Sequence, residues 1–255
     1  MTGGGTGIGA ATAQRLVAEG ARVALAGRRP GPLAEIAATL GDAALVVTGD
    51  AARTEDTQRM VAETVEAFGS LDVLVANAGG HLPGSAADLD DAAWDYCVAA
   101  NLDTAFRTVR AALPSLIAAR GNIVVLSSIA GLFAGPGVVG YVTTKHALIG
   151  LTRSIARDYG HLGVRANAVC PGWVRTPMAD EQMALLCERD GISVEQAYAL
   201  VSKDTPLRRP AEPSEIASVV AFLASADASA MTGTMLVADS GASCVDLPTL
   251  AFFEH

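Results

Sequence analysis

The strongest constraint on the fold is a glycine-rich segment at the start of the chain, MTGGGTGIGAATAQRL. Its key glycines, Gly3, Gly7 and Gly9, come directly before a helical pattern. Glycine lets the backbone approach a pyrophosphate, and the first N–H groups of the following helix can hold a phosphate. No lysine follows the last glycine, so the segment is not a Walker-type loop. A purely structural turn would have the same composition, so the segment alone does not decide the function.

Apolar, β-rich runs alternate with helical patterns along the rest of the chain. The expected strands are residues 21–27, 44–48, 71–77, 122–128, 164–170 and 233–238, and the expected helices are 10–20, 31–40, 54–68, 91–118, 138–160 and 213–225. Several strands are apolar at nearly every position, which is typical of parallel strands covered on both faces. The alternation predicts a single α/β domain over residues 1–255, with a doubly wound, Rossmann-like parallel sheet between two helical layers.

Local signals refine the helix boundaries. Thr54 is a candidate cap for the third helix, with only a partial capping box, and Asp90 or Asp91 is a candidate cap for the fourth. Pro213 is expected near the first position of the last helix. Residues 171–209 break the rhythm and carry a helical pattern at 179–201, so we expect a substrate loop or lid there.

Composition excludes several classes of function. Hydrophobic residues make up 51% of the chain and the net charge is −9, which argues for a large core and against a nucleic-acid partner. No apolar run has the length of a membrane span, and no His/Cys/Asp cluster has metal-ligand spacing. We therefore expect a soluble cytoplasmic protein with no bound metal. The cysteines are far apart and read as incidental thiols in a reducing compartment: Cys97, Cys170, Cys187 and Cys244.

The second expected strand ends in Ala26-Gly27-Arg28-Arg29. In a dinucleotide-binding fold, the residue after this strand meets the adenosine ribose, and an acid there favours NAD. Here Gly27 replaces the acid, and Arg28, assisted by Arg29, offers a cation to a 2′-phosphate. The segment favours NADP(H) over NAD(H), although two solvated arginines in a loop would look the same.

Three further features lie downstream. Asn77-Ala78-Gly79-Gly80 closes one strand, and its glycines permit close approach of a cofactor. Ser128 ends the next strand. Tyr141 and Lys145 are four residues apart in a predicted helix, so their side chains share one face.

Taken together, these motifs resemble the short-chain dehydrogenase/reductase family over nearly the whole chain. The TGxxxGxG turn of the family matches Thr2 to Gly9, its NAG segment matches Asn77 to Gly79, and its Ser-Tyr-Lys set matches Ser128, Tyr141 and Lys145. The resemblance implies the catalytic residues Asn101, Ser128, Tyr141 and Lys145. It implies cofactor contacts at Gly3, Thr6, Gly7, Ile8, Gly9, Arg28, Arg29, Asp50, Ala51, Asn77, Ala78, Gly79, Tyr141, Lys145, Pro171, Gly172, Val174 and Thr176.

The implied chemistry is hydride transfer between a nicotinamide and a ketone or secondary alcohol. Tyr141 would be the acid/base, with its pKa lowered by the Lys145 ammonium and the oxidised nicotinamide. Ser128 would stabilise the developing oxyanion. By resemblance, Lys145 would also bind the nicotinamide ribose, and Asn101 would hold a water that relays protons. The family further implies a homotetramer or homodimer.

One departure from the family concerns the first strand, which should precede the glycine turn at the centre of the sheet. Its absence would leave buried backbone groups unpaired on both neighbouring strands, at about 1–3 kcal/mol each. We expect the true start to lie upstream; the alternative is that the protein begins here with an impaired site.

The substrate pocket is expected to be apolar or mixed. Its candidate residues, about half of which we expect only to pack helices, are Ile129, Leu132, Phe133, Val138, Trp173, Met178, Met183 and Leu186. A carrier-linked 3-oxoacyl substrate is not favoured: basic residues would dock the acidic carrier, and although Arg120 is suitably placed, Leu162 offers no charge.

Three functions remain open from the sequence. The first is an NADP(H)-dependent oxidoreductase for a small or medium ketone or secondary alcohol. The second is an NAD-preferring dehydrogenase of the same fold. The third is a nucleotide-sensing or structural protein with an idle site, against which the intact Ser128, Tyr141 and Lys145 count.

Overall fold

Six parallel strands form the centre of the computed structural model, which describes residues 1–252. The strands are β1 (Val23–Gly27), β2 (Ala44–Thr48), β3 (Val73–Ala76), β4 (Asn122–Leu126), β5 (Arg165–Pro171) and β6 (Met235–Ala238). β1 pairs with β2, and the remaining strands pair in the order β3-β4-β5-β6. Every ladder is parallel. Each predicted strand is present, which confirms the Rossmann-like α/β fold.

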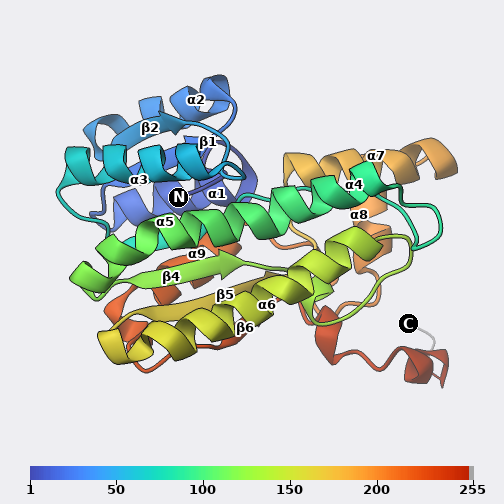
Figure 1. Cartoon of the computed structure of the whole chain (residues 1–255). Coiled ribbons are helices and arrows are strands. Elements are labelled where there is room, and N and C mark those ends of the chain that lie inside the picture. The colour runs from blue at the N-terminus through green and yellow to red at the C-terminus, as the bar shows by residue number, and fades with distance from the viewer. Residues whose placement is uncertain (253–255) are drawn as a thin grey trace.

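Helices cover both faces of the strands (Figure 1). They are α1 (Gly7–Ala18), α2 (Pro30–Leu40), α3 (Thr54–Phe68), α4 (Asp91–Cys97), α5 (Thr104–Ala119), α6 (Val139–Tyr159), α7 (Pro177–Asp190), α8 (Val194–Ser202) and α9 (Pro213–Ala224). α1, α2 and α9 pack on one face, and α3, α5 and α6 pack on the other. Among residues 1–252, no helix has both the length and the apolar character to cross a membrane.

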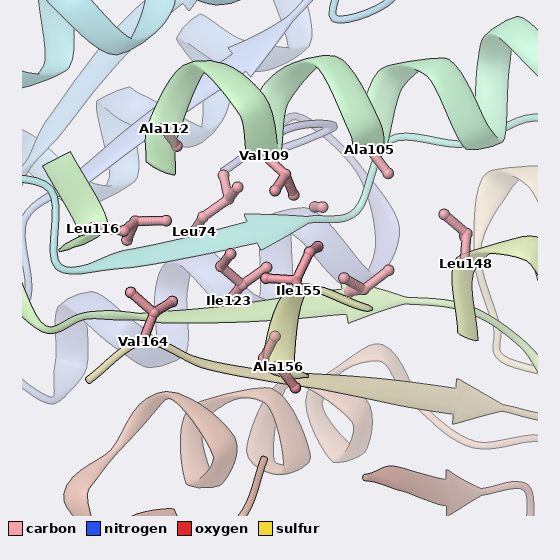
Figure 2. Close-up of a cluster of buried hydrophobic side chains, with 13 residues drawn as sticks. Leu74, Ala105, Val109, Ala112, Leu116, Ile123, Leu148, Ile155, Ala156 and Val164 are labelled. Atoms are coloured by element: carbon pink, nitrogen blue, oxygen red, sulfur yellow. The ribbon is translucent and has the colours of Figure 1, made fainter. Parts of the chain in front are cut away.

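The largest hydrophobic cluster lies between the strands and α5 and α6. Figure 2 shows Leu74 of β3 and Ile123 of β4 packed against Val109 of α5 and Ile155 of α6. All four side chains are almost completely buried. Removing this apolar surface from water holds the strand ends in fixed positions relative to α6, which carries Tyr141 and Lys145.

The capping predictions are partly confirmed. The Asp90 carboxylate accepts a hydrogen bond from Ala93 N at 2.8 Å and caps α4, and Pro213 is the first residue of α9. The prediction for Thr54 is wrong, because Thr54 is the first residue of α3 and Arg53 occupies the cap position. The Thr54 hydroxyl instead accepts hydrogen bonds from Arg107 and Arg110.

Met1 and Thr2 lie between β1 and β3, where the expected first strand belongs. The Met1 carbonyl accepts from Ala26 N at 2.8 Å, and the Thr2 amide donates to the Val75 carbonyl at 3.1 Å. The Met1 amino group donates to the Ala24 carbonyl at 2.8 Å. Beside these residues lies a cavity of about 220 Å³, lined by side chains of β1, β3, α1 and α3. This short extended segment thus links the backbones of the two sheets.

The segment from Pro171 to Arg209 contains two helices instead of the single helical pattern expected at 179–201. Gly191, with φ of 68°, ends α7, and a capping box at Ser193 starts α8. The two helices have their own apolar cluster, and the Tyr198 hydroxyl donates to Asp180 at 2.7 Å. In Figure 1, α7 and α8 lie near α4, at the end of the molecule toward which the β4 arrow points.

Candidate active site

A cavity of about 540 Å³ lies at the carboxyl ends of the parallel strands. This is where open α/β sheets bind their ligands. Most of the residues predicted to bind a cofactor or to catalyse line it: Gly3, Thr6, Gly7, Ile8, Arg28, Arg29, Asp50, Ala51, Asn77, Ala78, Gly79, Asn101, Tyr141, Lys145, Pro171 and Thr176. The fold thus brings together residues that are far apart in the sequence.

The glycine turn forms one wall of this cavity. Gly3 and Gly7 have φ of 64° and 53°, in the left-handed region that favours glycine. No side chain caps the N-terminus of α1, whose N-cap residue is Thr6. A side chain on Gly9 would overlap the Gly3 carbonyl oxygen, so that glycine allows α1 to pack closely on the turn. The turn has the open cradle and the exposed helix N-terminus that a pyrophosphate requires.

The Asn77 segment is joined to the glycine turn by hydrogen bonds. The Thr2 hydroxyl accepts from the amides of Asn77 and Ala78, each at 3.1 Å. The Asn77 side chain donates to the carbonyls of Thr2 and Gly3 at 3.2 and 3.1 Å. These contacts fix β3 and the turn relative to each other at the edge of the cavity.

The two arginines after β1 lie at one end of the cavity. Arg28 and Arg29 are exposed, and within residues 1–252 neither makes an ion pair. Asp50, after β2, accepts a hydrogen bond from Ala52 N at 3.0 Å. The guanidinium groups are available to a phosphate on a ribose bound beside Gly27.

Lys145 is buried at the floor of the cavity. Its ammonium donates to the Leu126 carbonyl at 2.9 Å, and only 5% of the residue is exposed. The Ser127 hydroxyl donates to the Lys145 carbonyl at 2.9 Å, which joins α6 to the end of β4. Burial lowers the pKa of Lys145 from its ordinary 10.5 to about 8.

Asn101 lies in a π-helical segment, Val98–Asp103, between α4 and α5. Such segments are frequent at functional sites. Its side chain donates to the carbonyls of Gly80 and Cys97 at 2.8 and 3.0 Å and accepts from Gly80 N at 3.2 Å. A Cβ on Gly79 would come within 2.9 Å of Asn101 Oδ1 and 3.6 Å of Lys145 Nζ, so the absence of a side chain keeps the space between them open.

Tyr141 faces the same cavity one helical turn before Lys145. The Lys145 Nζ lies 5.5 Å from the centre of the Tyr141 ring. Burial raises the pKa of Tyr141, and the neighbouring Ser128 hydroxyl acts in the opposite direction. Sequence reasoning expected a lowered pKa. That expectation combined the Lys145 ammonium with the positive charge of an oxidised nicotinamide; in the chain alone, the ammonium donates to the Leu126 carbonyl.

Four predicted site residues do not line the cavity: Gly9, Ser128, Gly172 and Val174. Ser128 lies two residues after the end of β4, next to Tyr141, and its hydroxyl accepts from Ala130 N at 3.1 Å. A side chain on Gly172 would contact Asp239, and Val174 pairs with Ala211 as an isolated bridge. These residues shape the surrounding backbone.

Of the predicted substrate-pocket residues, only Met178 lines the cavity. Met183 is buried in the cluster of α7 and α8, with Trp173 and Leu186 packed against it. These three residues take the helix-packing role that we expected for about half of the candidates, because α7 and α8 need an apolar core of their own. Phe133 is 53% exposed, outside the cavity.

Five polar residues that sequence reasoning did not single out also line the cavity: His81, Tyr96, Thr104, Ser127 and Glu181. The His81 ring is 5.3 Å from the Tyr141 ring, at an interplanar angle of 71°. Burial lowers the pKa of His81. His81 could have been found from the sequence, because it is a titratable residue directly after the Gly79-Gly80 pair that closes a predicted strand. Among residues 1–252, no three His, Cys, Asp or Glu side chains gather as metal ligands do.

Comparison with known proteins agrees with this geometry. The family profile described as enoyl-(acyl carrier protein) reductase matches residues 3–243. The chain is 50% identical to protein MoaE of Klebsiella aerogenes, over 99% of this chain and 97% of that protein. It is 34% identical to glucose 1-dehydrogenase of Gluconobacter oxydans, over 94% and 90%.

A solved structure of a variant actinorhodin polyketide ketoreductase with NADPH superimposes with a TM-score of 0.89. It is 33% identical, over 94% of this chain and 95% of that one. The profile match covers nearly the whole sequence. The chain belongs to the short-chain dehydrogenase/reductase family of oxidoreductases.

Proposed function

We propose that the protein is an NADP(H)-dependent oxidoreductase that interconverts a small or medium ketone and its secondary alcohol. The observation that carries the proposal is that Tyr141 and Lys145 line the same cavity as the glycine turn and Arg28. The glycine turn and the N-terminus of α1 would hold the pyrophosphate of a dinucleotide, Arg28 would bind its adenosine ribose, and Tyr141 and Lys145 would lie at its nicotinamide end. The open turn and the exposed arginines support this fit.

When bound, the reduced nicotinamide supplies a hydride to the carbonyl carbon. The Tyr141 hydroxyl donates a proton to the carbonyl oxygen, and the Ser128 hydroxyl donates a hydrogen bond to the same oxygen as charge develops on it. Lys145 binds the nicotinamide ribose and keeps positive charge near the phenol. Asn101 Oδ1 accepts from a water that passes a proton to Lys145 through the space beside Gly79.

The arginines support NADP(H) over NAD(H), because a 2′-phosphate gains charge-assisted hydrogen bonds there and a 2′-hydroxyl does not. The ketoreductase crystallised with NADPH and the relative named glucose 1-dehydrogenase support a carbonyl/alcohol pair as substrate. An NAD-preferring dehydrogenase is the alternative. A carrier-linked substrate has less support. An acidic carrier protein would need basic residues to dock on, and of the two expected positions only Arg120 is basic, whereas Leu162 is uncharged. We also propose a homotetramer by analogy with the family.

Steady-state turnover tests the proposal. The wild-type chain is expected to consume NADPH with at least one ketone of a panel of small and medium ketones, and to consume NADH less efficiently. Tyr141→Phe is expected to lower kcat by about a hundredfold or more, because the general acid is lost. Its dissociation constant for NADPH stays within about twofold, since the phenyl ring still fills the space. Loss of cofactor binding together with turnover would contradict the assignment of Tyr141 as the acid.

A further inference from the structure

We propose that His81 binds a hydroxyl group of the substrate next to the reacting carbonyl. The preferred substrates are then vicinal hydroxy ketones and the corresponding diols. This inference rests on the function proposed above and specifies its substrate class. Four observations carry it: the fixed position of the His81 backbone, the contact of its ring with Tyr141, the hydrogen-bonding capacity left on that ring, and its distance from the reacting atoms.

The backbone of His81 is held on both sides. On one side, the amide and carbonyl of Gly80 are both hydrogen-bonded to the Asn101 side chain. On the other, Gly84 forms a parallel bridge with Val138, and its amide donates to the Gly137 carbonyl at 2.7 Å. Because Val138 directly precedes α6, this bridge brings the loop after β3 against the first turn of α6. His81 therefore faces Tyr141 through a defined arrangement of two loops.

The His81 ring contacts Tyr141 edge-on and lines the cavity. Within residues 1–252, neither of its ring nitrogens has a hydrogen-bond partner. The cavity is also lined by other ionisable groups, namely Arg28, Arg29, Asp50, Tyr96, Tyr141, Lys145 and Glu181. Burial lowers the pKa of His81, so the imidazole is neutral near neutral pH. A neutral imidazole has one donor and one acceptor, which matches a hydroxyl group.

The position of the ring defines which part of a substrate it can reach. The carbonyl oxygen lies about 2.7 Å from the Tyr141 hydroxyl when the two are hydrogen-bonded. The centres of the two rings are 5.3 Å apart. Three bonds separate the hydroxyl oxygen of a vicinal hydroxy ketone from its carbonyl oxygen, so we expect the hydroxyl to reach the imidazole while the carbonyl stays hydrogen-bonded to Tyr141. A ketone without this group would leave the half-buried imidazole without a partner, which disfavours it.

A simpler alternative is that His81 only packs against Tyr141 and keeps its ring in place. The two roles differ in one respect. A packing role affects all substrates equally, whereas a hydroxyl-binding role affects only substrates that carry the vicinal hydroxyl. A comparison of two otherwise matched substrates therefore separates them.

The experiment compares cyclohexanone with the hydroxycyclohexanone whose hydroxyl is vicinal to the ketone. The ratio of kcat/KM for the two is measured in wild type, His81→Leu and His81→Gln. We expect His81→Leu to lower the preference for the hydroxy ketone about tenfold, the effect of losing one hydrogen bond in a partly buried site. His81→Gln should restore part of the preference. His161→Leu, at an exposed histidine outside the cavity, is the control and should leave the ratio unchanged.

A binding measurement separates failure of this inference from failure of the proposed function. Dissociation constants of the vicinal cyclohexanediol and of cyclohexanol are measured by calorimetry in the Tyr141→Phe background with NADP⁺ bound, where no turnover interferes. If the diol binds more tightly than cyclohexanol and His81→Leu abolishes this difference, the inference is supported. This holds even if wild type reduces neither ketone, because the lack of turnover would refute only the proposed function. An unchanged ratio in folded His81→Leu, or equal losses for both substrates, would overturn the inference.

Discussion

The Thr2 hydroxyl and the backbone of Asn77 are hydrogen-bonded to each other at 3.1 Å, although they are far apart in the sequence. The same oxygen accepts from Ala78 N, and Thr2 is only 3% exposed. One side chain therefore satisfies two backbone donors and holds the glycine turn against the end of β3. The cofactor cradle depends on this contact as much as on the glycines.

Thr2→Val keeps the shape of the side chain but removes the acceptor. Because two part-buried N–H groups lose their partner, we expect the free energy of unfolding to fall by up to about 1–3 kcal/mol for each group that water does not reach. Denaturation in urea measures this change, and Thr2→Ser, which keeps the hydroxyl, is the matched control. Equal stability of the Val and Ser variants would show that the hydroxyl is not needed there.

Arg28→Glu is expected to reverse the cofactor preference. A carboxylate at this position repels a 2′-phosphate and accepts a hydrogen bond from a 2′-hydroxyl, so NADPH affinity should fall about tenfold or more while NADH affinity holds or rises. Dissociation constants measured by fluorescence titration check this. Arg157→Glu, at an exposed arginine near the end of α6, makes the same change of charge away from the cavity. A similar loss of NADPH affinity in both variants would show that the change in net charge is responsible, and it would contradict the role of Arg28.

The Met1 amino group makes stability depend on pH. Burial lowers its pKa from 8.0 to about 6, so the unfolded chain binds more protons than the folded chain between these values. Stability should therefore rise as the pH increases from 6 to 8, by about 1–3 kcal/mol. The free energy of unfolding is compared for the free and the N-acetylated chain, since the acetylated chain lacks this titration. The same pH dependence in both forms would exclude the amino group as its source.

An extension of Val-Ile-Val before Met1 is expected to raise the melting temperature. The cavity of about 220 Å³ beside Met1 is lined by apolar side chains of β1 and β3, and an added strand would fill it and pair with both backbones. The extension would also move the amino group out of its buried position. Gly-Ser-Gly is the control of equal length. If both extensions change the melting temperature equally, the cavity does not accept a strand.

Sequence reasoning identified the residues that lie close together along the chain or that belong to one motif. Tyr141 and Lys145 share a helical face because they are four residues apart, and the strand ends were clear from apolar runs bounded by Gly27 and Asn77. Sequence reasoning failed where contacts between segments far apart in the chain determine the role of a residue. Thr54 does not cap α3 because its hydroxyl binds Arg107 and Arg110, and Met183 is buried because α7 and α8 pack on each other.

The position of His81 shows the same limit. Nothing within a few residues of it indicates a contact with Tyr141. The contact follows from the bridge between Gly84 and Val138, which pairs two loops that no periodic pattern connects.

The most direct test of the account follows the hydride itself. NADPH carrying deuterium at the transferable position of the nicotinamide is incubated with the chain and a ketone that it reduces, and the alcohol is analysed by mass spectrometry. The account predicts one deuterium on the carbinol carbon with wild type and almost none with Tyr141→Phe, which still binds NADPH. Oxidation of NADPH without label in the alcohol, or undiminished labelling by Tyr141→Phe, would contradict hydride transfer with Tyr141 as the proton donor.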